Sequence, residues 1–95
     1  MSTKARQIEA VKALEALYRD SSDAAGDALT PHQVIDFHLH RLRLYFGEFE
    51  VEPKLLRFWQ KKRGENHSIG KLIKILDDIA DRFAADVRTL ESEPE

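Results

Sequence analysis

The stretch DFHLHRLRLYF, residues Asp36 to Phe46, decides the fold class, because it fits three different structures. Its first residues alternate between apolar and polar, as in a half-buried β-strand. Its two histidines suggest a metal site, and its Leu, Tyr and Phe residues suggest a buried helical face. The alternation fails at Arg41-Leu42, where a strand would exchange its two faces. A strand therefore does not fit.

The residues before this stretch carry a signal for the start of a helix. Thr30 can act as the N-cap, Pro31 suits the first helical position, and Gln33 completes a capping box. From there the apolar residues recur at helical spacing: Val34, Ile35, His38, Leu39, Leu42, Tyr45 and Phe46. We predict a helix from Pro31 to Phe46, ended by Gly47.

Phe37 and Leu44 fall outside the main apolar face of this helix. Either a second neighbour covers them or they are exposed to a partner.

Three other segments have helical periodicity. They are Ala5–Arg19, Pro53–Arg63 and Ile69–Leu90. A small polar loop is expected at residues 21–27, and Ser68 is the expected cap of the last segment. The sequence predicts an all-α fold, a compact antiparallel bundle of four to six helices without a sheet. Residues 1–90 form a single domain and residues 91–95 an acidic tail.

Composition limits the classes of protein that remain. The chain has 95 residues, of which 42% are hydrophobic and 34% charged, and it has no cysteine. Disulfide scaffolds and thiol chemistry are therefore excluded. No apolar run approaches the ~18–20 residues of a membrane span. The N-terminus, MSTKARQIEA, lacks the apolar segment of a secretory signal, so a cytoplasmic location without membrane association is expected.

Charge is unevenly spread along the chain. Residues 38–74 contain nine Lys or Arg against four Glu, a local charge of +5. Residues 75–95 contain two Arg against seven acidic residues, a local charge of −5. Opposite charges of this kind can steer docking onto a second copy or onto a charged partner. An ordinary solvated surface would have the same appearance.

Catalytic and metal chemistry receive weaker support. His38 lies in the apolar face, where a hydrogen-bonded core imidazole is expected. His32, Asp36 and His40 are spaced i, i+4, i+8 and could present ligands in a row, although a further ligand such as His67 would be needed. His40 also has a superficial likeness to a phosphotransfer histidine, but bulky residues follow it. A packing and surface role is favoured for all of them, with no metal.

No phosphate-binding loop, GxSxG or HExxH motif is present. Asp77, Asp78 and Asp81 are predicted to lie on the polar side of their helix, where solvent keeps carboxylates ionised and inert. We therefore predict that the chain is not an enzyme and uses no cofactor.

A basic cluster near Trp59 could bind phosphate backbones. Its members are Arg57, Lys61, Lys62, Arg63, Lys71 and Lys74. Residues 53–76 have the proportions of a helix-turn-helix, but Gly64 is flanked by charged residues where that motif prefers apolar ones. A small nucleic-acid-binding regulator is the alternative function.

The stretch LLRFWQKKRGENHSIGKLIKILDDIADRFAADV, residues 55–87, resembles the last three helices of the death-domain family. The resemblance is carried by Trp59, Gly64, Ser68, Ile69, Leu72, Leu76, Ile79 and the pair Ala85-Asp86. It covers about a third of the chain. The first half departs from the family, with one long helix where two are expected, and Ala80 replaces the usual turn glycine. Membership implies a break near Ala80-Asp81 and a non-enzymatic module that assembles with copies of itself or with related domains.

The sequence thus predicts a protein-protein interaction module of the adaptor or regulatory kind, docking through charged helical surfaces. The candidate partner-binding residues are Arg57, Lys61, Lys62, Arg63, Asp77, Asp78, Asp81, Phe37 and Leu44.

Overall fold

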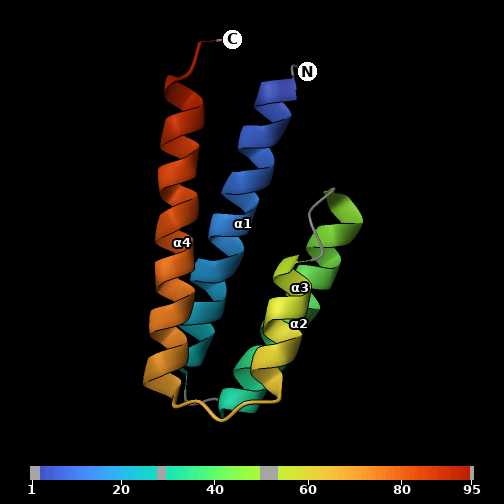
Figure 1. Cartoon of the computed structure of the whole chain (residues 1–95), viewed down its shortest axis with the longest axis vertical. Coiled ribbons are helices and arrows are strands. Elements are labelled where there is room, and N and C mark those ends of the chain that lie inside the picture. Colours follow the sequence, from blue (N-terminus) through green and yellow to red (C-terminus); the bar gives the residue numbers. More distant parts are fainter. Residues whose placement is uncertain (1–2, 28–29, 50–53, 95) are drawn as a thin grey trace.

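A computed structural model describes residues 3–27, 30–49 and 54–94 and confirms the all-α prediction. Its four helices are α1 (Thr3–Ala25), α2 (Pro31–Glu48), α3 (Lys54–Arg63) and α4 (Ile69–Ser92). Successive helices run in opposite directions, so that the start of α1 and the end of α4 lie at the same end of the bundle (Figure 1). The described residues contain no strand.

The helix starts follow the local signals in the sequence. The Thr30 hydroxyl accepts from the Gln33 amide at 3.2 Å, and the Thr30 amide donates to the Gln33 side chain at 2.9 Å. Ser68 caps α4 in the same way, with its hydroxyl accepting from the Lys71 amide at 3.2 Å. Capping groups satisfy amides that the first turn leaves without intrahelical partners. Pro53, the predicted first residue of α3, lies outside the described residues.

The predicted ends of α1 and α2 are wrong, because both helices continue further along the chain. α1 continues past Arg19 to Ala25, through residues that the sequence predicts as loop. Ser21 is fully buried there, and its hydroxyl donates to the Leu17 carbonyl at 3.0 Å. A side chain that bonds to its own helix no longer competes with helix formation. Gly47 lies inside α2, which ends at Glu48.

α4 is a continuous helix of 24 residues. The break near Ala80-Asp81 that the death-domain resemblance implies is therefore wrong. Ala80 is fully buried, and alanine is the best helix former, so nothing local interrupts the helix. α4 also extends beyond Leu90 to Ser92, into the predicted acidic tail. Lys4 of α1 donates to the Glu93 carbonyl at 2.7 Å, which ties this end to the bundle.

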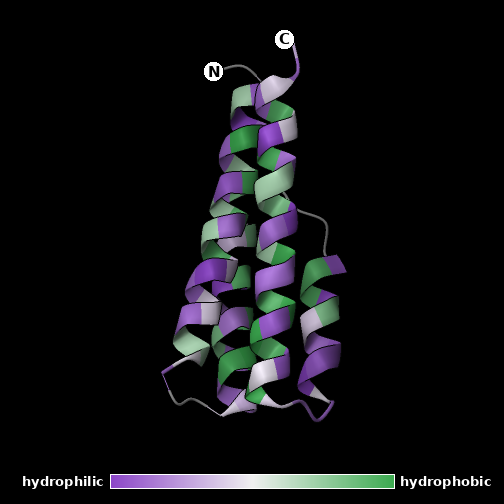
Figure 2. Ribbon diagram, turned by 90° about the vertical axis from the view of Figure 1, so that its left-hand side faces the viewer, coloured by the Kyte–Doolittle hydropathy of each residue, from purple (hydrophilic) through white to green (hydrophobic). Residues whose placement is uncertain are grey.

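The packing is uneven among the helices. α1 and α4 lie against each other over most of their length, α2 packs beside α1, and α3 packs on α2. The N-terminal part of α1 and the C-terminal part of α4 project together beyond the shorter helices (Figure 1). Hydrophobic residues follow stripes along the helices (Figure 2). The core therefore lies between the lower half of the α1–α4 pair and α2, with α3 as a short cover.

Three rings from three helices form the centre of the core. The imidazole of His38 lies 4.3 Å from the ring of Tyr18 and 4.7 Å from the ring of Trp59, edge-on to both. The indole of Trp59 donates to the Tyr18 hydroxyl at 2.8 Å. All three side chains are fully buried. Because the indole finds an acceptor, burying its N–H leaves no unpaired donor.

Candidate protein-interaction groove

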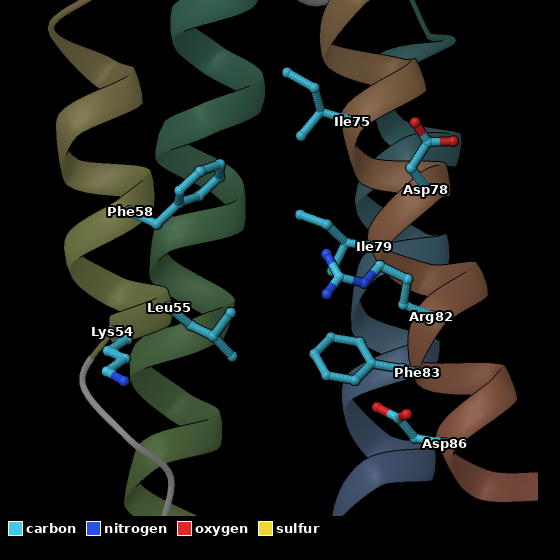
Figure 3. Close-up of a pocket in the computed structure, with 9 residues that line it drawn as sticks. All are labelled: Lys54, Leu55, Phe58, Ile75, Asp78, Ile79, Arg82, Phe83 and Asp86. Atoms are coloured by element: carbon cyan, nitrogen blue, oxygen red, sulfur yellow. The ribbon is translucent and has the colours of Figure 1, made fainter. Parts of the chain in front are cut away.

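An apolar groove of about 560 Å³ runs between α3 and α4. Leu55 and Phe58 of α3 point across it toward Ile75, Ile79 and Phe83 of α4 (Figure 3). Phe58 is 40% exposed, which is unusual for a side chain of this size. The groove therefore presents apolar surface to solvent from both walls.

The groove exists because both helices have more apolar surface than the bundle covers. α4 buries one row against α1: Leu72, Leu76, Ala80 and Val87. Ile75, Ile79 and Phe83 follow one another at four-residue spacing on the adjacent side and are only partly buried. α3 has ten residues and directs Trp59 into the core, which leaves Phe58, about 100° around the helix, on the groove side.

Charged residues line the edges of the groove. Lys54 contributes from α3, and Asp78, Arg82 and Asp86 contribute from α4. Lys62 lies over the face of the Phe58 ring, 5.3 Å from its centroid. An apolar floor with charged edges is the usual anatomy of a protein-binding site.

The predicted basic residues lie on α3 but differ in their availability. Arg63 donates to both carboxylate oxygens of Asp36 on α2, and this contact lowers the pKa of Asp36 below its usual value. Lys62 pairs with Glu65 at 3.2 Å. Arg57 and Lys61 are exposed and form no ion pair with any described residue. Of the four, Arg57 and Lys61 are therefore the cations free to meet a partner.

The predicted acidic residues face different neighbours. Asp78 lies at the groove, where it accepts from Lys74 one turn earlier at 3.2 Å. Asp81 instead accepts from Arg19 of α1 at 2.8 Å, and Asp77 also interacts electrostatically with Arg19. Only Asp78 of these three belongs to the groove. Its neighbour there, Asp86, was not among the predicted site residues.

Phe37 and Leu44 are exposed on α2, 37% and 63% respectively, and neither lines the groove. The Arg41 guanidinium lies 5.4 Å from the centroid of the Phe37 ring and pairs with Asp20 of α1 at 2.9 Å. Phe37 is therefore partly covered by its own chain, while Leu44 is the more accessible residue.

The sequence reasoning missed Phe58 and Ile75. Phe58 stands beside Trp59, which takes the inward position of α3, and Ile75 lies between two residues of the main α4 stripe. The sequence did contain a signal for Ile75: the apolar face of α4 is wider than one neighbouring helix can cover.

His38 occupies a structural position in the core, whereas His32 and His40 are exposed. With the Ser21 hydroxyl donating to Leu17, the Nδ1–H of His38 donates to Ser21 Oγ over 2.6 Å. Burial lowers the pKa of His38 to about 3. A serine and an imidazole at this distance resemble a nucleophile and its base, but both are fully buried, so a substrate cannot reach them. The core role predicted for His38 is confirmed.

His32, Asp36 and His40 do not form a set of free metal ligands, because Arg63 forms an ion pair with Asp36. Across residues 3–27, 30–49 and 54–94, no three histidine or acidic side chains come together in a way that could hold a metal ion.

No protein-family model, curated protein sequence or solved structure gives a significant match to this chain. None of the helices, over the part of the chain that the structure describes, combines the length and the apolar character needed to cross a membrane.

Proposed function

We propose that this chain is a non-enzymatic protein-protein interaction module whose α3–α4 groove binds a helix of a protein partner. The observation that carries the proposal is the groove itself, with Phe58 exposed between two apolar walls and charged edges. An amphipathic helix that lays its apolar face into such a groove is a common mode of recognition. The proposal does not depend on kinship with the death-domain family, against which the continuous α4 helix counts.

Phe58 supplies the expected anchor of binding. A phenylalanine presents roughly 200 Å² of surface, so its exposed 40% corresponds to roughly 80 Å². Covering this area contributes about 2 kcal/mol, or roughly a 30-fold change in affinity. Aromatic residues in desolvated pockets carry much of the energy of protein interfaces.

Affinity capture with matched variants tests the proposal. Wild-type protein, Phe58→Ser and Leu44→Ser are immobilised and exposed to an extract of cells that produce the protein naturally. Leu44 is the control, because it is also an exposed apolar residue but lies away from the groove. We expect proteins that bind to wild type and Leu44→Ser but not to Phe58→Ser. Equal retention by all three would refute a role for the groove.

The nucleic-acid alternative finds less support. Trp59 is fully buried and cannot stack on a base, and Lys62 and Arg63 already pair with acidic side chains. α4 packs along α1, whereas the second helix of a helix-turn-helix must be free to enter a groove of DNA. A gel shift with a short duplex DNA and a short RNA tests this alternative. Binding that weakens with salt and is lost in Arg57→Glu/Lys61→Glu would favour it.

A further inference from the structure

We infer that the partner in the groove is a second copy of this chain, related by a two-fold axis parallel to the helices. This inference rests on the proposed function of the groove. Such an axis places α3 of each copy against α4 of the other. The resulting contact is isologous, because the same two surfaces meet twice.

Charge complementarity between α3 and α4 selects this arrangement. α3 contains five basic residues and no acidic residue over Lys54–Arg63. On the groove side of α4, Asp78 and Asp86 stand against one Arg, Arg82. An axis perpendicular to the helices and lying in the interface would place α3 against α3 and so bring two basic helices together. The parallel axis brings unlike charges together at both contacts.

Part of this charge has no ion-pair partner among the described residues of one chain. The described residues provide no ion-pair partner for Arg57 and Lys61 on α3 or for Asp86 on α4. Lys62 and Arg63 pair with Glu65 and Asp36, neither of which belongs to α4. Asp78 pairs with Lys74 of its own helix, so Asp86 of α4 and the cations Arg57 and Lys61 of α3 remain available across an interface.

The positions along the groove also agree with this axis. A rotation about an axis parallel to the helices keeps every residue at its own level. In Figure 3, Phe58 lies between the levels of Ile75 and Ile79, while Lys54 and Asp86 lie at the same end of the groove. Each Phe58 ring would therefore enter the apolar row of the second copy. Lys54 would face the second copy's Asp86.

A stable dimer requires a defined amount of buried surface. A stable interface buries roughly 800 Å² per partner, which is about an eighth of this chain's 6130 Å² of accessible surface. A second copy brings the apolar residues and both signs of charge that the groove needs.

Sedimentation equilibrium over a concentration series up to about 1 mM tests the inference. We expect a wild-type dimer, and roughly a hundredfold or greater increase in the dissociation constant for Phe58→Ser, because the dimer contains two rings. Leu44→Ser is the matched control and should dimerise like wild type. Circular dichroism establishes that each variant is folded.

Charge-reversal variants, tested alone and as a mixture, test the proposed two-fold arrangement. Two double variants each place like charges at both contacts: Arg57→Glu/Lys61→Glu and Asp78→Lys/Asp86→Lys. The dissociation constant of each homodimer should rise about tenfold or more. A mixture of the two variants restores unlike charges at both contacts and should form a heterodimer. Formation of that heterodimer supports the two-fold arrangement.

A wild-type monomer at every concentration overturns the inference, and so does a dimer that the variants do not change. Either result leaves the proposed function to be judged separately by capture on Phe58→Ser. If wild type captures a different protein and Phe58→Ser does not, the groove binds a helix of that protein instead. Equal capture by all variants would mean that the groove binds neither.

Discussion

Lowering the pH from 7 to 5 should destabilise this protein through His38. The imidazole is fully buried between Tyr18 and Trp59, and its pKa is lowered to about 3, first by burial and then by the positive charge of Arg41. In the unfolded chain its pKa is about 6.5. The unfolded state therefore takes up a proton first. The stability contributed by the neutral imidazole is complete above the unfolded pKa and is lost as the pH falls toward 3.

The magnitude follows from these two pKa values. Each pH unit well below 6.5 costs about 1.4 kcal/mol, since the unfolded state is protonated and the folded state is not. Between pH 7 and pH 5 the free energy of unfolding should fall by about 2 kcal/mol on account of this residue. Such a change is a large part of the 5–15 kcal/mol that is typical of folded domains.

Urea denaturation at pH 7, 6 and 5 measures the effect. The variants are wild type, His38→Leu, which cannot titrate, and His40→Gln, which removes an exposed histidine from the same helix. In His38→Leu the Ser21 hydroxyl keeps its bond to the Leu17 carbonyl. We expect wild type and His40→Gln to lose about 2 kcal/mol more than His38→Leu between pH 7 and 5. The same pH dependence in all three proteins would refute the reasoning.

Three further changes test the packing and the helix starts, each followed by urea unfolding. Trp59→Phe should lower the free energy of unfolding by about 2 kcal/mol, because it removes the bond to Tyr18 and leaves a void; a loss below about 0.5 kcal/mol would contradict this. Thr30→Ala and Ser68→Ala should each cost about 1 kcal/mol, and the double variant should show their sum, because the two caps belong to different helices. Ala80→Gly should cost about 1 kcal/mol or more, because α4 is continuous through this residue; a neutral effect would contradict this.

The helices were predictable because their signals are local. A cap and its capping box join residues three apart, as at Thr30 and Gln33, and an apolar face repeats every three or four residues. These relations are visible in the sequence before any tertiary contact forms. The interpretation of DFHLHRLRLYF as helix rests on them alone, and so does the expectation of a core position for His38.

The end of α1 could not be predicted in this way. Ser21, Ser22 and Asp23 favour a loop by their intrinsic preferences, yet they are helical. Ser21 lies against His38, which is 17 residues away in the sequence. Only the packing of α2 on α1 gives the serine this buried partner. This contact stabilises the helical conformation of α1 beyond its predicted end.

The groove depends on tertiary structure in the same sense. Helical periodicity identifies the broad apolar face of α4 but does not determine which of its rows a neighbour will cover. The contact with α1 buries the row of Leu72, Leu76 and Ala80 and leaves Ile75 and Ile79 beside α3. The sequence by itself therefore determined the all-α fold, the starts of α2 and α4 and the segregation of charge. Packing alone decided where apolar surface remained uncovered, because burial depends on neighbours that are distant along the chain.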